Sequence, residues 1–286
     1  MIKDFIVLTK FVLSFAVSLS ALFAYIMAKG EIGTDMFIAT FAVLLVAMGV
    51  STLNQYQEYK EDALMERTKH RPVASGKWSP RSAVIIAAVL IISSLVLIYD
   101  LLGYIGVDLF LFSFLWYNFF YTPLKKKSAL AVVPGAILGV IPPAIGWLAA
   151  GGSLAQPEFF ALGLFYFIWQ IPHFWLLVML HYGDYAGAGY PTAMRLFGKM
   201  SLQRLTYYWL MLTIMTGYFM VTVFQPASTV IIGILMLTAL LAFISSLQLL
   251  TKDFDLKRAR KVFWQINLAF LGTVILISID EFLKVQ

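Results

Sequence analysis

The sequence predicts an all-α, polytopic membrane protein with nine transmembrane helices. Of its 286 residues, 61% are apolar and only 13% are charged, and the mean hydropathy is +0.85, which is too apolar for a soluble globule. Long apolar runs recur along the whole chain, and Lys and Arg gather in alternate connections between them. Because charge is confined to short segments, we expect one membrane-embedded domain over residues 1–286, with the lipid bilayer as its solvent.

Nine segments account for the spans. A helix needs about 20 mostly apolar residues to cross the hydrocarbon core of a bilayer. The segments that meet or nearly meet this length are residues 11–27, 36–53, 83–99, 107–121, 129–149, 159–180, 205–224, 229–250 and 262–279. The fourth is short and contains Asp108.

Prolines mark the fifth and sixth segments. Pro134, Pro142 and Pro143 interrupt the fifth, and Pro172 lies within the sixth. A proline inside a span frees a backbone carbonyl, which must then be satisfied by protein or by water in a cavity. We therefore expect these two helices to line a cavity.

The positive charges predict the orientation. All but two of the 21 Lys and Arg residues fall in the termini and loops of one side, and the exceptions are Lys29 and Lys284. The positive-inside rule then puts the amino terminus in the cytoplasm and the carboxyl terminus outside. The short amino terminus runs directly into a span, so neither a signal peptide nor a transit peptide is expected, and the plasma membrane is the predicted location. Since the net charge of +6 serves topology, no nucleic-acid partner is expected.

Asn54, Glu58 and Asp62 form the first candidate site. The chain has no cysteine, so a metal would need oxygen or imidazole ligands. These three residues are spaced four apart, and on a helix continuing from the second span they stack on one face. Such a row suits Mg²⁺, which completes its shell with phosphate and water. A solvated helix end, balanced by Lys60 and Arg67, explains the spacing as well, and spacing alone slightly favours it.

Cations follow the acids directly, at Arg67, Lys69 and Arg71. A diphosphate needs this combination, because magnesium bridges its oxygens and guanidinium groups fork onto them. Topology signalling explains the side of the membrane on which these cations lie, but it does not explain their place beside three oxygen ligands.

At these residues the sequence resembles the UbiA-type intramembrane prenyltransferases, whose first signature is an Asn and two acids spaced in this way. The stretch from Met65 to Pro72 resembles in particular the branch that farnesylates protohaem. Four further stretches also resemble that branch, namely YTPLKKK at 121–127, IPPAIGW at 141–147, WQIPHFW at 169–175 and DYAGAGYP at 184–191. Glu58 stands where the family usually has Asp. The resemblance implies a nine-helix bundle around a central cavity.

The resemblance also implies roles for these residues. Asn54, Glu58 and Asp62 would hold one Mg²⁺ on the diphosphate, and Asp184 would help to hold a second. The cations that would stabilise the departing pyrophosphate are Arg67, Lys69, Arg71, Lys125 and Lys126. Farnesyl diphosphate is the implied donor and protohaem the implied acceptor, whose vinyl group attacks an allylic carbocation in a dry, aromatic-lined cavity before water completes the product. Another acceptor, such as an aromatic acid or a quinone precursor, is the alternative.

His173 is the main candidate for contact with the acceptor. An ionisable side chain inside a span is a functional candidate, and this one would contact haem iron or a propionate. A neutral histidine bonded within the bundle is an equal alternative. The other residues expected at the cavity are Trp169, Tyr121, Asn118 and Tyr185, although a polar anchor at a helix end explains Asn118 and Tyr121 at least as well. A transporter is disfavoured, because the ionisable residues crowd one face and no paired repeat is visible.

Overall fold

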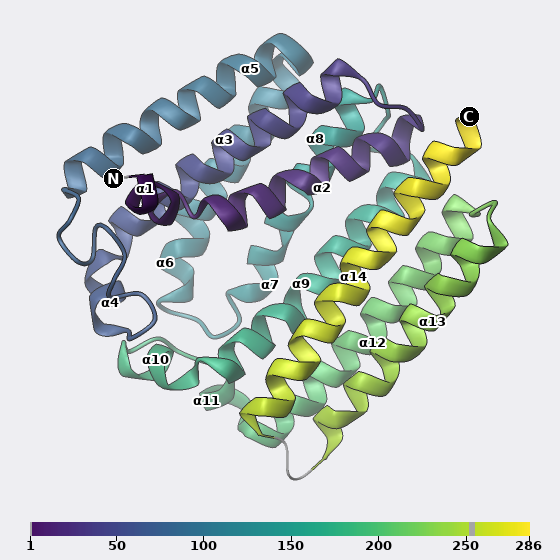
Figure 1. Ribbon diagram of the computed structural model, residues 1–286. Helices are drawn as coiled ribbons and strands as arrows, with labels where there is room; N and C mark the ends of the chain where they lie inside the picture. Colours follow the sequence, from purple (N-terminus) through teal and green to yellow (C-terminus); the bar gives the residue numbers. More distant parts are fainter. Residues whose placement is uncertain (1, 252–254) are drawn as a thin grey trace.

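In the computed structural model, residues 2–251 and 255–286 are described, and within these ranges the chain forms helices and no strand (Figure 1). The elements in chain order are α1 Ile2–Leu8, α2 Phe11–Lys29, α3 Thr34–Gln57, α4 Tyr59–Leu64, α5 Pro80–Leu115, the π-helix η1 Trp116–Tyr121, α6 Thr122–Lys125, α7 Val132–Gly135, the 3₁₀ helix η2 Ala136–Gly139, α8 Ile141–Ala149, α9 Pro157–Leu180, α10 Tyr182–Gly187, α11 Ala193–Phe197, α12 Lys199–Phe224, α13 Thr229–Ser246, the 3₁₀ helix η3 Leu247–Leu250 and α14 Leu256–Val285. The predicted all-α class is confirmed.

Within the described ranges, eight helical segments are long and apolar enough to cross a membrane, so the predicted count of nine is not confirmed. The predicted third and fourth spans both lie in one of these segments, Pro80–Lys125. Its backbone leaves helical geometry at Gly103, where φ is 61° and ψ is −145°. Glycine tolerates this left-handed φ at little cost. Figure 1 shows the chain running out along α5 and returning to α6, so the two predicted segments lie on either side of the break.

The predicted fifth span is three short pieces, α7, η2 and α8, instead of one helix. Pro142 and Pro143 stand at the start of α8, where a missing backbone N–H costs least. Gly146 of α8 lies directly against the backbone of Ala21 in α2. The absence of a side chain at Gly146 therefore lets the two helices approach closely.

The helices differ in how far they are enclosed. In the most apolar stretches of α3 and α9, 56% of the residues are buried, whereas in α5, α12, α13 and α14 only 28% are. The outer helices expose large apolar side chains, among them Ile92, Met215, Met236, Leu240 and Trp264. Water would not tolerate this many exposed apolar side chains, whereas a bilayer does. The chain is therefore built as a membrane protein.

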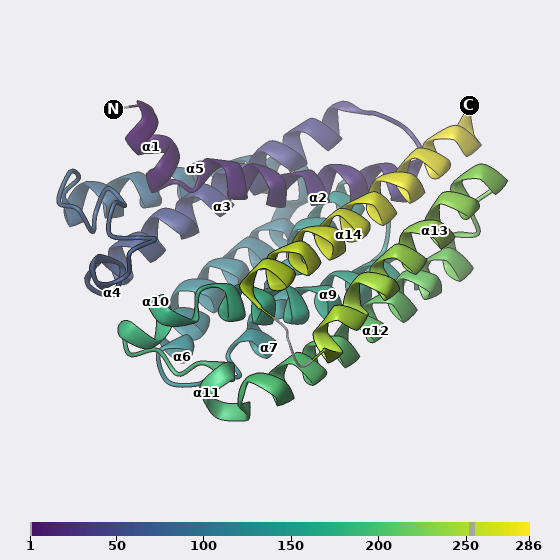
Figure 2. The ribbon, with the colours of Figure 1, turned by 60° about the horizontal axis from the view of Figure 1, so that its bottom comes forward.

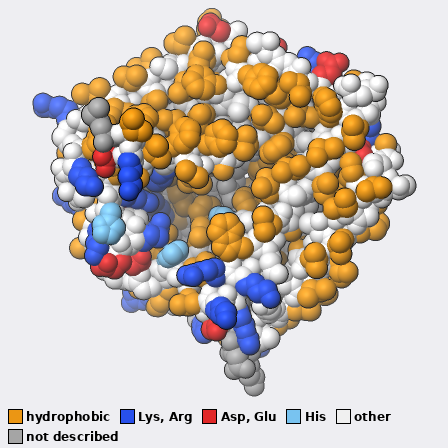
Figure 3. All heavy atoms as spheres, viewed as in Figure 1, with side chains coloured by type: hydrophobic (Ala, Val, Ile, Leu, Met, Phe, Trp, Pro, Cys, Tyr) orange, Lys and Arg blue, Asp and Glu red, His pale blue; other side chains and the backbone are white. Residues whose placement is uncertain are grey.

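Charged connections gather at one end of the bundle. In both ribbon views α1, α4, α6, α10 and α11 lie together at that end, and the loop after α12 and the carboxyl terminus lie at the other (Figures 1 and 2). Figure 3 shows the surface hollowed near this charged end, with Lys and Arg along the left and lower rim of the hollow and apolar side chains above and to its right. At the opposite end, Lys284 Nζ donates to the carbonyl of Phe224 at 2.8 Å.

Candidate active site

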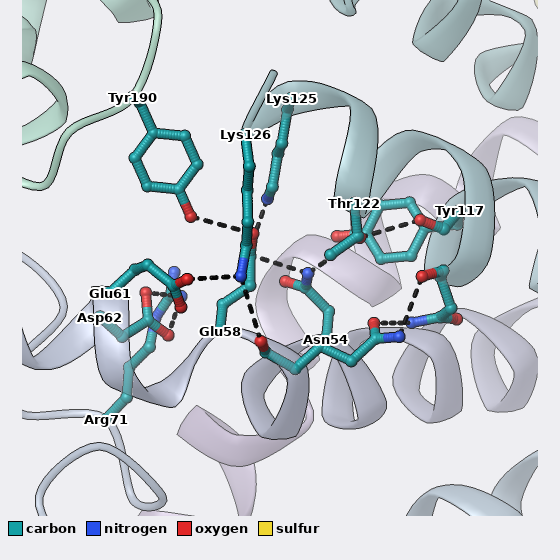
Figure 4. Close-up of polar contacts among 12 residues, drawn as sticks. Asn54, Glu58, Glu61, Asp62, Arg71, Tyr117, Thr122, Lys125, Lys126 and Tyr190 are labelled. Atoms are coloured by element: carbon teal, nitrogen blue, oxygen red, sulfur yellow. Dashed lines mark hydrogen bonds and ion pairs between the residues drawn. The ribbon is translucent and has the colours of Figure 1, made fainter. Parts of the chain in front are cut away.

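The first acidic motif lies where α3 ends. Asn54 is in its last turn, Glu58 stands at the break to α4, and Asp62 lies within α4. Asn54 Nδ2 donates to Glu58 Oε2 at 2.9 Å (Figure 4), and Asp62 N donates to Glu58 O at 2.8 Å. The exposed fractions of the three residues are 1%, 3% and 2%. The motif therefore does not behave as a solvated helix end.

Four oxygen-bearing side chains of this region each meet a cation from another segment. Lys125 Nζ donates to Glu58 Oε2 at 2.7 Å, and Arg71 Nη1 lies 2.8 and 2.7 Å from the two carboxylate oxygens of Asp62. The two remaining pairs are Lys10 Nζ with Asn54 Oδ1 at 3.0 Å and Lys126 Nζ with Glu61 Oε1 at 2.5 Å. We call these four pairs the acid–cation cluster.

The cluster shifts the pKa values of two of its members. Burial acts to raise the pKa of Glu58, but the ammonium groups of Lys125 and Lys10 and the amide of Asn54 outweigh it, so that the pKa lies below its usual range. Burial lowers the pKa of Lys10 to about 7, and repulsion from Arg71 and Lys125 acts in the same direction. At neutral pH Glu58 is therefore ionised, and Lys10 loses its charge as the pH rises through about 7.

The second acidic loop reaches the cluster through a tyrosine. Tyr190 Oη donates to Glu58 Oε1 at 3.1 Å. Burial and the negative charge of Glu58 raise the pKa of Tyr190 far above its usual range, so it stays protonated and donates. Tyr185 packs edge-on against Tyr190, with ring centroids 6.0 Å apart, and its neighbour Asp184 on α10 is partly exposed. The two acidic loops thus lie on one side of the bundle, as a shared diphosphate site requires.

Two of the cations predicted to bind the diphosphate, Arg67 and Lys69, lie away from the acids of the acid–cation cluster. Lys69 pairs with Glu66 at 2.6 Å, and the two side chains are 41% and 80% exposed. Arg67 is also exposed. Burial of His181 lowers the pKa of that histidine, and the positive charge of Arg67 lowers it further. Of the predicted set, the structure brings three to the acids, namely Arg71, Lys125 and Lys126.

The π-helix η1 is anchored to α3 by a pair of amides. Asn118 is fully buried, and its Nδ2 donates to Val50 O at 3.1 Å and to Gln57 Oε1 at 3.0 Å. Gln57 Nε2 donates back to Asn118 O at 2.9 Å. These contacts make Asn118 a buried polar link between η1 and α3. π-helical turns are rare and often mark functional sites.

Two tyrosine rings of η1 lie beside the cluster. Tyr117 and Tyr121 stack with centroids 5.8 Å apart, and the Lys125 ammonium lies 5.7 Å from the centroid of Tyr121. Thr122 Oγ1 accepts from Asn54 Nδ2 at 3.2 Å and donates to Tyr117 O at 2.9 Å. Thr122 therefore links the backbone of Tyr117 to Asn54, the first candidate metal ligand. The faces of the two tyrosine rings are of the kind that attracts cations.

His173 of α9 is held by Asn267 of α14. Its Nδ1 lies 2.7 Å from Asn267 Oδ1. Asn267 Nδ2 donates to Phe263 O at 2.5 Å, which directs the amide oxygen towards the histidine. Nδ1 therefore donates, and in the neutral ring Nε2 carries the lone pair.

Trp169 belongs to an apolar region. It stacks on Phe270 with ring centroids 3.9 Å apart and lies 4.8 Å from the ring of His173. It also lines a cavity of about 390 Å³ between α9, α12, α13 and α14, and no member of the acid–cation cluster lines that cavity. The aromatic residues next to the acids are instead Tyr117, Tyr121 and Tyr190.

Sequence reasoning missed five residues of this site, namely Lys10, Glu61, Tyr117, Thr122 and Tyr190. Thr122 and Tyr190 lie inside the stretches 121–127 and 184–191 singled out above, and that was their only signal. Lys10 is 44 positions from Asn54, so no local pattern connects them.

Comparisons with known proteins identify the family of this chain. The UbiA prenyltransferase family matches residues 2–271. The protoheme IX farnesyltransferase of Flavobacterium johnsoniae is 33% identical, over 98% of this chain and 95% of that protein. The enzyme of the same name from Oleidesulfovibrio alaskensis is 39% identical over 61% of this chain, and the match spans 62% of that relative's length.

Solved structures share the fold. A solved structure from work on digeranylgeranylglyceryl phosphate synthase aligns with a TM-score of 0.76 at 17% identity, and the alignment covers 98% of each chain. A UbiA homologue from Archaeoglobus fulgidus bound to GPP and Mg²⁺ has a TM-score of 0.68 at 14% identity, over 96% of this chain and 99% of that one. By the extent of the family match and of the F. johnsoniae alignment, this chain belongs to the UbiA prenyltransferase family.

Proposed function

We propose that this chain transfers a farnesyl group from farnesyl diphosphate to a vinyl group of protohaem IX, giving haem O. One observation carries the proposal: buried carboxylates and buried or half-buried Lys and Arg side chains meet at one point, where both acidic loops converge. This mixture of charges suits a metal-bound diphosphate. The relatives named protoheme IX farnesyltransferase support this donor and acceptor.

The side chains of the first motif fit Mg²⁺. Asn54, Glu58 and Asp62 offer the hard oxygen donors that this ion prefers. In the described ranges, no group of three or more His, Asp or Glu side chains could hold a metal by itself; Mg²⁺ commonly uses one or two carboxylates and completes its shell with phosphate and water. We assign the first ion to these three residues and a second to Asp184. When bound, the metal neutralises charge on the leaving diphosphate.

The cations of the cluster hold the diphosphate. Arg71, Lys125 and Lys126 would donate to its oxygens and stabilise the charge that grows as the bond from farnesyl C1 to oxygen breaks. The vinyl carbon then forms a bond to C1, the adduct cation takes up water, and that water loses a proton. Pyrophosphate leaves with the electron pair of the broken bond. The rings of Tyr117 and Tyr121 would face the allylic cation and exclude water until the new bond has formed.

Gly135 provides a test of the tyrosine position. A Cβ at this residue would lie 2.6 Å from Cε2 and 2.7 Å from Cδ2 of Tyr121, and a rigid ring must shift as a whole to make room. We expect Gly135→Ala to lower kcat roughly 10- to 100-fold, since small displacements of positioning groups are costly. Steady-state kinetics of farnesyl transfer would measure this. Gly272→Ala in α14, which has open space at its Cβ, is the control, and equal kcat values for the two variants would contradict the role of Tyr121.

His173 is our candidate for the residue that contacts the acceptor. Its Nδ1 is committed to Asn267, so Nε2 is the atom that would coordinate haem iron or accept from a propionate. An acceptor held at His173 would lie along α9, the helix that leads directly into the second acidic loop at α10.

We propose that residues 1–286 form one membrane-embedded domain in the plasma membrane. The end that carries the acid–cation cluster would face the cytoplasm, because the cation-rich connections lie there. The amino terminus would then be cytoplasmic and the carboxyl terminus outside.

The acceptor is tested with purified full-length protein in detergent. We expect farnesyl diphosphate, protohaem and Mg²⁺ together to give hydroxyfarnesylated haem, detected by mass spectrometry, and expect EDTA to abolish it. Product with an aromatic acid or a quinone precursor, and none with protohaem, would move the assignment to the alternative acceptor class.

A further inference from the structure

Both carboxylate oxygens of Glu58 accept hydrogen bonds from elsewhere in the chain. Oε2 accepts from Lys125 and Asn54, and Oε1 accepts from Tyr190. Both oxygens of Asp62 accept from Arg71. Figure 4 shows these contacts converging from α3, α4, the loop after α4, α6 and the second acidic loop. A metal that binds Glu58 through Oε2, or Asp62 through both of its oxygens, would therefore displace Lys125 or Arg71.

Burial makes that displacement costly. The side chains of Glu58 and Asp62 are 4% and 2% exposed, and those of their partners Lys125 and Arg71 are 25% and 19% exposed. A charge that loses its partner in such surroundings is penalised far more than one at the surface. A metal bound alone would strand the two cations, and a diphosphate bound alone would strand the two carboxylates.

We infer that the metal and the diphosphate bind as a coupled pair by exchanging partners with the chain: Glu58 and Asp62 pass from Lys125 and Arg71 to the metal, while these cations pass to the diphosphate. The inference rests on the proposed function and deepens it. Coupling of this kind is reciprocal, so each ligand raises the affinity for the other by the same factor.

A second observation supports the coupling. No set of three or more His, Asp or Glu side chains in the described ranges is arranged to hold a metal. The described His, Asp and Glu side chains therefore do not form a metal site by themselves, and diphosphate oxygens would complete the shell of an ion held at Glu58 and Asp62. Partner exchange and shared ligation both favour joint binding.

The test measures Mn²⁺ binding to the full-length protein in detergent by electron paramagnetic resonance, with and without inorganic pyrophosphate, corrected for the Mn²⁺–pyrophosphate complex in buffer. We expect pyrophosphate to raise the affinity for Mn²⁺ at least 10-fold. Lys125→Gln should raise the affinity for Mn²⁺ alone several-fold, because Glu58 loses its competitor, and should reduce the enhancement by pyrophosphate at least 10-fold. Lys127→Gln, an exposed neighbour, should behave as the wild type.

Glu58→Gln should have the corresponding effect on pyrophosphate binding. It frees Lys125, so isothermal titration should show tighter binding of pyrophosphate alone and little effect of Mn²⁺ on it. Size-exclusion profiles check that both variants fold. The exchange would be overturned if pyrophosphate left the affinity for Mn²⁺ unchanged, or if Lys125→Gln weakened the binding of Mn²⁺ alone. In either case, haem product in the transfer assay would leave the proposed function standing. No Mn²⁺ binding under any condition would remove both the inference and the metal role.

Discussion

Asp62→Asn should lower farnesyl transfer by about 100- to 1,000-fold, the usual cost of removing one preorganised electrostatic group from an active site. The side chain is 2% exposed and accepts both hydrogen bonds from Arg71. Asparagine keeps its shape but removes the negative charge, which weakens both the proposed metal ligand and the hold on Arg71. Steady-state kinetics with farnesyl diphosphate and protohaem measure the loss.

The control for this variant is Glu66→Gln, which removes a carboxylate one turn further along. Glu66 is 80% exposed and pairs with Lys69 at the surface, so its loss should change turnover less than 2-fold, in line with the small energies of exposed pairs. Asp62→Ala is a poorer probe, because it leaves the guanidinium of Arg71 without a partner and combines a folding defect with the chemical one. Wild-type turnover by Asp62→Asn would count against the metal assignment.

Gly146→Ala should destabilise the protein by about 3 kcal/mol, the upper end of the range for overpacked cores. A Cβ at this position would contact the carbonyl oxygen of Ala21 and would lie 2.6 Å from its carbonyl carbon and 2.8 Å from its Cα. These are backbone atoms of α2, so no side-chain rotation can relieve the clash. The two helices must separate, and the packing between α2 and α8 is lost.

Thermal unfolding in detergent, followed by the monodisperse fraction after heating, measures this effect. Gly233→Ala is the matched control, because this glycine also lies in a helix, α13, and has open space where a Cβ would be. It should be neutral or slightly stabilising, since alanine has the higher helix propensity. Equal thermal stability of the two variants would show that α2 and α8 do not pack as the structure has them.

The membrane class and the positions of the helices could be read from the sequence, because hydropathy and charge act over short stretches of chain. The predicted continuous helix through Asn54, Glu58 and Asp62 is wrong, because α3 ends at Gln57 and the backbone breaks at Glu58 before α4 begins. Two further details escaped. Gly103 divides α5 by its backbone conformation alone, and the proline-rich fifth span breaks into three pieces.

The candidate site could be predicted only in part. Arg67, Lys69 and Arg71 look alike in sequence, yet of these three only Arg71 reaches an acid of the acid–cation cluster, because the loop after α4 turns the other two outwards. Trp169 lies on a stretch that resembles the family, but it packs on Phe270 in the apolar region. The direction in which a side chain points is decided by how the neighbouring elements pack, and residue spacing along one segment does not reveal it.

The sequence by itself determined that the chain crosses a bilayer, which of its connections carry the charge, and which residues of the first motif offer oxygen ligands. Tertiary structure alone decided which cation meets which acid. Lys10 and Asn54 are 44 positions apart, and Tyr190 and Glu58 are 132 apart. Such partners are brought together by the packing of helices on one another, which depends on many distant contacts at once, whereas hydropathy and helical periodicity are properties of each segment alone.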